Sequence, residues 1–127
     1  MIHTFGYVML IVQDMQRSVE FYQKLLQKKP DFTSPRWSQF AVGKVLIGLH
    51  AVDSWSDPND HLRSFGSGQK GLSFGLYVDD INGFIEELSS QKISIAHGPR
   101  MTGLGNTIYL VDPDGYYIQL CQPNVKA

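Results

Sequence analysis

The stretch YVMLIVQDMQRSVEFYQKLL, residues 7–26, decides the fold. Its first six residues, Tyr7–Val12, are apolar throughout, which is typical of a strand covered on both faces. Asp14 then stands where a helix N-cap is expected. The apolar side chains that follow it recur at helical spacing: Met15, Val19, Tyr22, Leu25 and Leu26. Because Pro30 cannot continue a helix, the stretch predicts a strand followed by one amphipathic helix.

The same pattern returns in LSFGLYVDDINGFIEEL, residues 72–88. Leu72–Val78 predicts a strand, Asp80 a helix cap, and Ile81, Phe84, Ile85 and Leu88 one apolar helix face. The two stretches match at a constant offset, which pairs Val12 with Val78, Asp14 with Asp80, Met15 with Ile81 and Val19 with Ile85. Two amphipathic units can resemble each other by chance, but the matching order of elements favours an internal duplication.

Further strands are expected after each helix. Trp37–Val42 and Val45–His50 flank Gly43-Lys44, a pair suited to a tight hairpin. In the second half we expect a short strand at Ile93–Ala96 and a break at Gly98-Pro99. A hairpin then runs from Thr107 to Cys121. It turns at Asp112-Pro113-Asp114-Gly115, which fits a type I turn followed by a left-handed residue.

The length of 127 residues predicts a single domain spanning residues 1–127. Within it we place module one at about 1–56, a polar linking loop at about 51–71, and module two at about 72–127. The loop contains Asp57-Pro58 and Gly66-Ser67-Gly68, and loops of this length in small domains tend to be functional or mobile.

Composition excludes several classes of function. With 43% hydrophobic and 18% charged residues and a net charge of -1, the chain has the make-up of a soluble globular protein. The sequence has no basic stripe of the kind that indicates nucleic-acid binding, and it has no apolar run long enough to cross a membrane. The single cysteine, Cys121, fits a reducing compartment, so we expect a cytoplasmic protein.

Residues 7–26 and 72–88, together with DPDGYYIQL at 112–120, resemble the glyoxalase/bleomycin resistance protein/dioxygenase (vicinal oxygen chelate) superfamily in order and spacing. The resemblance implies an α+β fold of two βαβββ modules that form a U-shaped mixed β-sheet around a cavity, with helices on the outer face. It also implies a homodimer. Pairing of two chains would cover the strand edges and apolar cavity walls that an open sheet exposes.

Strand alternation then predicts which side chains face the cavity. In the first half these are Tyr7, Met9 and Ile11 on the first strand and Leu46, Gly48 and His50 on the last. In the second half they are Ser73, Gly75 and Tyr77 on the first strand and Tyr117, Gln119 and Cys121 on the last. The residues between them pack on the helices.

Metal-dependent members of the superfamily place ligands at four cavity-facing positions, which correspond here to Tyr7, Gly48, Ser73 and Gln119. Only Gln119 is of a type that ligates readily, and one amide does not hold a divalent ion. We therefore expect no metal, no cofactor and no catalytic residue.

The leading hypothesis is a metal-free small-molecule-binding protein, similar to the bleomycin-binding members of the superfamily, that sequesters a drug or toxin. Trp37 and Trp55 could cover such a pocket, whereas His3 and His97 are expected at the surface. The predicted ligand-binding residues are Tyr7, Met9, Trp37, Leu46, Gly48, His50, Ser73, Tyr77, Tyr109, Tyr117 and Gln119.

Two alternatives remain open. One is a metal-dependent lyase or dioxygenase with a displaced site around His50 and Gln119, joined by His61. The other is an interaction module whose cleft is filled by its own side chains.

Overall fold

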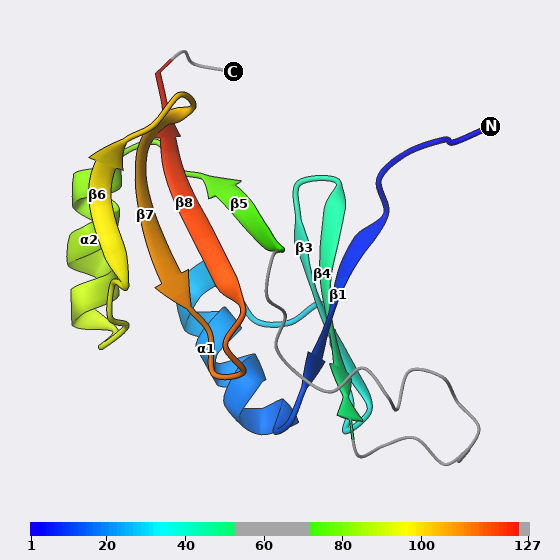
Figure 1. Cartoon of the computed structure of the whole chain (residues 1–127). Coiled ribbons are helices and arrows are strands. Elements are labelled where there is room, and N and C mark those ends of the chain that lie inside the picture. The colour runs from blue at the N-terminus through cyan, green and yellow to red at the C-terminus, as the bar shows by residue number, and fades with distance from the viewer. Residues whose placement is uncertain (53–71, 125–127) are drawn as a thin grey trace. The chain divides into compact units, whose positions relative to one another are not determined.

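The structure, a computed structural model, describes residues 1–52 and 72–124. The chain separates into two compact units, Met1–Gly68 and Gln69–Ala127. In the described residues each unit holds one helix and one four-stranded sheet (Figure 1). Neither of these helices is long and apolar enough to cross a membrane.

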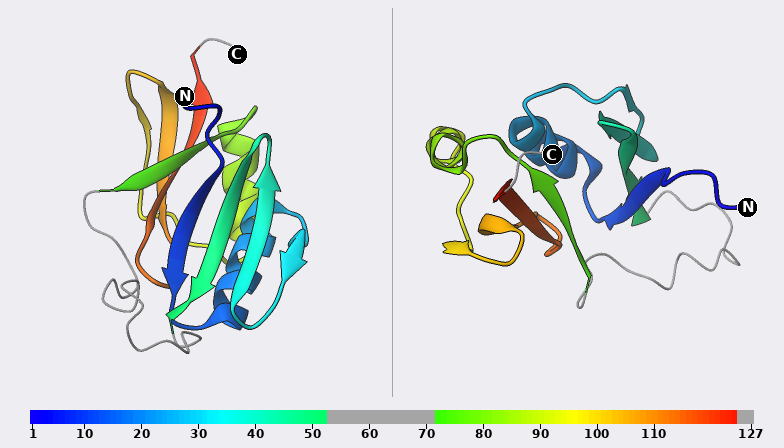
Figure 2. Two further views of the ribbon diagram at one scale, coloured as in Figure 1. Left: turned by 90° about the vertical axis from the view of Figure 1, so that its right-hand side faces the viewer. Right: turned by 90° about the horizontal axis from the view of Figure 1, so that it is seen from above.

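The first module, residues 1–52, has its strands in the order β1-β4-β3-β2 (Figure 2, left). β1 and β4 run parallel, with Met9 opposite Gly48, and the other neighbours run antiparallel. A parallel pair needs a long crossover connection, and α1 lies within it. The elements are β1 (Tyr7–Val12), α1 (Met15–Leu26), β2 (Phe32–Thr33), β3 (Trp37–Val42) and β4 (Val45–Ala51).

The second module, residues 72–124, repeats this topology in the order β5-β8-β7-β6. β5 is parallel to β8, and the remaining neighbours are antiparallel. The predicted repetition of the element order and the α+β fold of two βαβββ modules are confirmed. The elements are β5 (Ser73–Tyr77), α2 (Ile81–Ser90), β6 (His97–Met101), β7 (Gly105–Val111) and β8 (Tyr117–Pro123).

One face of the first sheet is buried together with an apolar stripe of α1. Leu10, Ile47 and Leu49 are buried on alternate strand positions, as the alternation predicts. From α1, Tyr22 is fully buried, and its ring centroid lies 6.4 Å from that of Phe40 on β3. Each such side chain removed from water contributes roughly 1.5–3 kcal/mol to stability.

The second sheet is buried in the same way. On the helix side the buried strand residues include Ile108, Leu110, Ile118 and Leu120, and Ile81 and Leu88 are the buried residues of α2. Phe84, expected in the core, is only half-buried. The shorter helix therefore leaves part of its apolar stripe accessible.

The two helix starts differ in how their free N–H groups are satisfied. Asp14 Oδ1 accepts a hydrogen bond from the Arg17 amide at 3.1 Å, which confirms the predicted cap. Asp80 has the N-cap position, but its side chain makes no capping bond. The Ile81 amide instead donates to Oε1 of Gln122, 2.9 Å away on β8. A distant side chain thus replaces the expected local one.

The turn between β7 and β8 is organised by one buried carboxylate. Oδ1 of Asp112 accepts from the amides of Asp114 and Tyr116, both at 2.9 Å. The Gly115 amide donates to the Asp112 carbonyl at 3.0 Å, and Gly115 has a φ of +93°. This geometry confirms the predicted turn and its left-handed residue.

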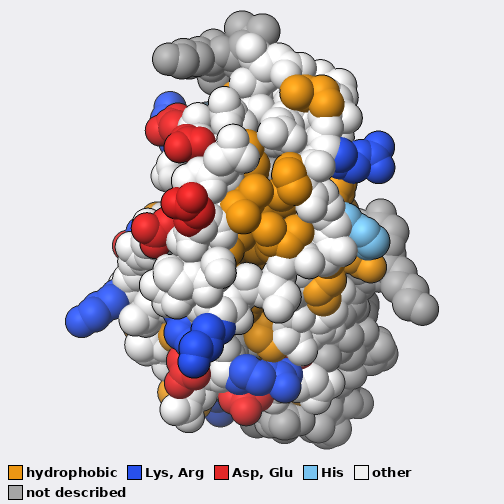
Figure 3. Space-filling view, turned by 90° about the vertical axis from the view of Figure 1, so that its left-hand side faces the viewer, with side chains coloured by type: hydrophobic (Ala, Val, Ile, Leu, Met, Phe, Trp, Pro, Cys, Tyr) orange, Lys and Arg blue, Asp and Glu red, His pale blue; other side chains and the backbone are white. Residues whose placement is uncertain are grey.

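The strand expected at Ile93–Ala96 was wrong. The sheet's edge strand is β6, His97–Met101, and it includes the Gly98-Pro99 pair that was expected to be a break. Ile93 and Ile95 alternate as strand residues do, but they are half-buried and line a pocket with Ile85 of α2. Figure 3, seen from the side of α2, shows hydrophobic side chains gathered on this face.

Strand β2 was missed because two residues, Phe32–Thr33, carry no periodic signal. It is positioned by Asp31, whose carboxylate accepts from the Ala41 amide at 2.6 Å and from Nζ of Lys28 at 3.0 Å. The Ala41 hydrogen bond, and after it that of Lys28, holds the pKa of Asp31 below its usual range.

Replacing Asp112 by Ala is expected to destabilise the protein by about 1–3 kcal/mol, because two turn amides lose their acceptor and one of them belongs to the buried Tyr116. Urea unfolding measures the change. Asp112→Asn, which keeps one oxygen acceptor, should lose less. Asp79→Ala, which removes an exposed carboxylate, should stay within about 0.5 kcal/mol of the parent. Equal stability of Asp112→Ala and the parent would contradict this account of the turn.

Candidate functional site

The four positions that the resemblance assigns to metal ligands fall into two pairs, one in each unit. Tyr7 on β1 and Gly48 on β4 lie on the same face of the first sheet, because Tyr7 pairs with Leu46. Ser73 on β5 pairs with Tyr117 on β8, two residues before Gln119, so Ser73 and Gln119 lie on the same face of the second sheet. Each pair therefore lies on the face opposite to the one that packs on a helix.

The space of a side chain at Gly48 is taken by the indole of Trp37 on the neighbouring strand β3. A Cβ added at Gly48 would overlap the six-membered ring of Trp37, and Gly48 is buried although it has no side chain. The indole Nε1 donates to Oε1 of Gln39 at 2.9 Å, and Gln39 is the residue opposite Gly48. The glycine is thus what allows the indole to lie at this place on the sheet.

Tyr7, Trp37 and His50 form an aromatic cluster on this face. The ring centroid of Trp37 lies 6.3 Å from that of Tyr7 and 6.0 Å from that of His50, both in edge-on arrangements. Such edge-to-face contacts are the favoured geometry of aromatic pairs. Nδ1 of His50 lies 3.1 Å from the Ala51 carbonyl oxygen, which ties the imidazole to the strand end.

Two more predicted lining residues, Met9 and Leu46, lie half-buried on the same face as the aromatic cluster. All six ligand-binding residues predicted for the first half therefore share one face of one sheet. Together they present aromatic and thioether surface with few polar groups. Tyr7, 60% exposed, offers a hydroxyl.

In the second module the two residues at the metal-ligand positions are hydrogen-bonded to each other. Nε2 of Gln119 donates to Oγ of Ser73 at 2.7 Å. Tyr109 is opposite Gln119 and Tyr117 is opposite Ser73, so both lie on this face. Tyr77 and Tyr117 are 65% and 45% exposed. All five ligand-binding residues predicted for the second half share the face, which is rich in phenol groups.

The side chains present do not fit a divalent metal ion. Gly48 offers no ligating atom and Trp37 occupies the space of one, while Gln119, whose Nε2 donates to Ser73, offers a single amide oxygen. Within residues 1–52 and 72–124 no group of three His, Cys, Asp or Glu side chains comes together. His61, which the displaced site would recruit, and Trp55 both lie outside the described residues.

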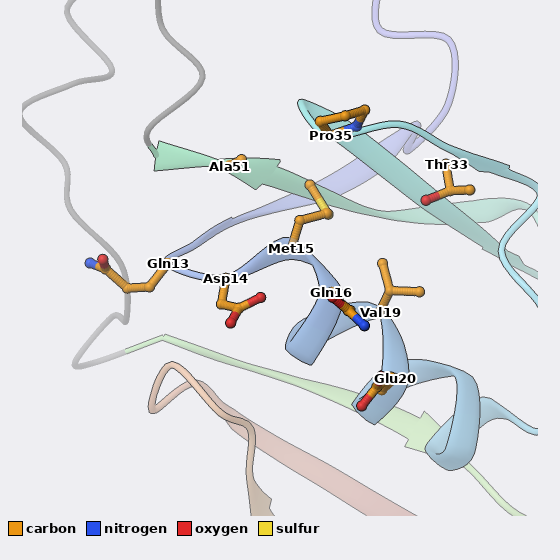
Figure 4. Close-up of a pocket in the computed structure, with 9 residues that line it drawn as sticks. All are labelled: Gln13, Asp14, Met15, Gln16, Val19, Glu20, Thr33, Pro35 and Ala51. Carbon is orange, nitrogen blue, oxygen red and sulfur yellow. The ribbon is translucent and has the colours of Figure 1, made fainter.

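One pocket beside α1 was not anticipated. It has a volume of about 560 Å³, and Figure 4 shows Met15 and Val19 pointing toward it from the helix. Both had been assigned to the packed stripe of the helix, yet both are only half-buried. Their spacing alone gave no sign of this, since a stripe beside a pocket and a stripe in the core have the same period. The remaining lining residues are Gln13, Asp14, Gln16, Glu20, Thr33, Pro35 and Ala51.

The family model described as the Glyoxalase/Bleomycin resistance protein/Dioxygenase superfamily matches residues 4–120. The phenazine antibiotic resistance protein EhpR of Enterobacter agglomerans is 27% identical over 117 residues, 89% of this chain and 87% of that protein. The lactoylglutathione lyase of Pseudomonas aeruginosa is 22% identical over 152 residues, covering 98% of this chain and 85% of the enzyme. The structure of TnmS3, an antibiotic binding protein from Streptomyces sp. CB03234, matches with a TM-score of 0.73 at 23% identity, covering 97% of this chain and 98% of that one. The predicted resemblance is confirmed, and the structural match supports the fold.

Replacing Gly48 by Ala should displace the Trp37 indole and destabilise the protein by about 1–3 kcal/mol. In a Trp55→Phe background, where Trp37 is the remaining one of two tryptophans, the displacement should change the intrinsic fluorescence spectrum. Urea unfolding gives the stability. The matched control is Gly75→Ala on β5, where an added Cβ would lie 3.7 Å from its nearest neighbour and cause no overlap.

A double-mutant cycle tests whether the overlap with Trp37 causes the loss of stability in Gly48→Ala. If the overlap with Trp37 is responsible, Gly48→Ala should cost clearly less in a Trp37→Ala background. The same cost in both backgrounds would show that the indole does not depend on the glycine.

Proposed function

Since the chain belongs to the glyoxalase/bleomycin resistance protein/dioxygenase superfamily but has Trp37 over Gly48 where the resemblance expects a metal ligand, we propose that it binds a small organic molecule without a metal. The role that we infer is sequestration of a drug or toxin. The indole in the place of a ligand side chain carries the proposal. Gly48 provides no metal-ligating atom, and the indole that fills its side-chain space supplies flat apolar surface there.

The preferred ligand is planar and aromatic. The aromatic cluster of Tyr7, Trp37 and His50 offers surface on which a flat ring system can stack. The relatives are in keeping with this, because one is a phenazine antibiotic resistance protein and a structural neighbour is an antibiotic binding protein. Phenazine itself is a flat fused-ring heteroaromatic and makes a suitable first probe.

The proposed contacts of the ligand are of two kinds. Aromatic and apolar side chains provide most of the surface, and hydroxyl, amide and imidazole groups fix the orientation, which is the usual make-up of a small-molecule site. On the open face of the first sheet the proposed contacts are Tyr7, Met9, Trp37, Leu46, Gly48 and His50. On the open face of the second sheet, taken by itself, they are Ser73, Tyr77, Tyr109, Tyr117 and Gln119.

We also propose that the protein forms a homodimer. In each sheet the outer strands, β1 and β2 or β5 and β6, have a neighbour on one side only within the described residues. Unpaired strand edges are commonly covered by association. Light scattering at micromolar concentration should give twice the mass of one chain, and the mass of a single chain would contradict the proposal.

Calorimetric titration with phenazine should show saturable binding, and Trp37→Ala should weaken it by about tenfold through loss of the stacking surface. Phe21→Leu changes an aromatic residue on α1, away from the cluster, and should bind as the parent does. Phenazine recovered after binding should be chemically unchanged, as sequestration requires.

Elemental analysis of protein purified without chelator should find no stoichiometric metal, and added nickel, zinc or iron should leave phenazine binding unchanged. One metal per chain that is lost in His50→Ala would overturn the proposal. The protein would then be a metal-dependent lyase or dioxygenase with a displaced site.

A further inference from the structure

Strand β6 carries a bulge that redirects one of its side chains. His97 pairs with Tyr109 and Arg100 pairs with Thr107, so three steps along β6 match two steps along β7. In a regular strand, residues three apart point to opposite faces of the sheet. The extra residue places Arg100 on the same face as His97.

The bulge has a local cause in Gly98. This residue has a φ of +93°, and a Cβ there would lie 2.6 Å from the carbonyl oxygen of Thr107. Only glycine allows the backbone of β6 to approach β7 so closely in this conformation. The sequence HGPRM at residues 97–101 therefore specifies where Arg100 points.

The redirected side chain completes a pocket of about 630 Å³ lined by His97, Gly98, Pro99, Arg100 and Tyr109. The imidazole of His97 stands edge-on to the phenol ring of Tyr109, with ring centroids 6.3 Å apart. The pocket thus joins a permanent cation, an imidazole and a flat aromatic ring. Tyr109 is also one of the residues proposed above to contact the ligand.

Arg100 is exposed, and no carboxylate of the described residues forms an ion pair with it. A guanidinium presents a planar fork of donors that matches a carboxylate through two parallel hydrogen bonds. An imidazole keeps at least one N–H donor in either protonation state. The two groups together favour an oxyanion attached to a ring.

We propose that Arg100 and His97 form an anion subsite that binds the carboxylate of an aromatic acid, with Tyr109 against its ring. This deepens the proposed function, on which it rests, by assigning an anionic group to the ligand. The sequence had placed His97 at the surface with no role, because the effect of the bulge on Arg100 is not visible in the strand pattern.

Amide NMR spectra of the full chain, recorded during titration with benzoate or with benzamide, test the subsite. Benzoate should shift the amide signals of His97, Gly98, Arg100 and Met101 and bind about tenfold more tightly than the uncharged benzamide. Arg100→Gln should reduce benzoate binding to the level of benzamide and leave benzamide unaffected. Lys92→Gln, which removes another exposed cation of the second module, should keep the full preference for benzoate.

Equal binding of the two probes by the parent, or an unchanged preference in Arg100→Gln, would overturn the subsite. Phenazine has no carboxylate, so its titration separates the two proposals. A benzoate response at β6 without phenazine binding would show that Arg100 and His97 bind a carboxylate and would contradict the stacking proposed at Trp37. Phenazine binding without the benzoate response would remove the subsite alone.

Discussion

Each module depends on the parallel pairing of its first strand with its last, β1 with β4 and β5 with β8. A parallel pair requires a crossover, and the helix within that crossover buries one face of the sheet. Alternate residues are thereby committed to the helix side of the sheet, and the residues between them face the other way. A slip of one residue would exchange the two sets. The register that protects Leu10 and Leu49 is therefore the same constraint that puts Tyr7 and Gly48 on the opposite face.

The duplicated backbone carries different chemistry in its two halves. In the first module the indole of Trp37 occupies the space of a side chain at Gly48, whereas in the second Gln119 and Ser73 are joined by a hydrogen bond. The first arrangement gives apolar surface, and the second gives a polar pair flanked by tyrosines. Topology sets where these residues lie, but the residues themselves set what they can bind.

Much of this could be predicted from the sequence, because alternation, helical spacing and the Asp112 turn are local patterns. The failures were contacts between segments far apart in the sequence. The expected strand at Ile93–Ala96 has a convincing alternation, yet its isoleucines lie beside α2. Likewise, Asp80 holds the cap position, but the bond comes from Gln122. Contacts of this kind cannot be predicted from local sequence patterns.

In the candidate site, too, the local pattern could be predicted from the sequence, but the contacts between strands could not. Strand parity predicts that the candidate residues face away from the helix, as they do, but it does not say that Trp37 lies over Gly48. That contact depends on the side-chain conformation of Trp37, which lets the indole reach across to the neighbouring strand. Gln39 holds this conformation by accepting a hydrogen bond from the indole N–H. A cluster of rings could therefore be expected from the sequence, but not its arrangement.

The coupling between Gly48 and Trp37 bears on how the missing ligand is interpreted. A glycine alone would leave a gap in the face, and an indole alone would overlap any side chain at that position. A ligating residue at position 48 could be accommodated only if the Trp37 indole moved away as well. Neither change suffices by itself, so the two residues depend on each other, and Gln39 holds the indole in place. This mutual dependence of Gly48 and Trp37 is the observation on which our proposal of ligand binding at this face rests.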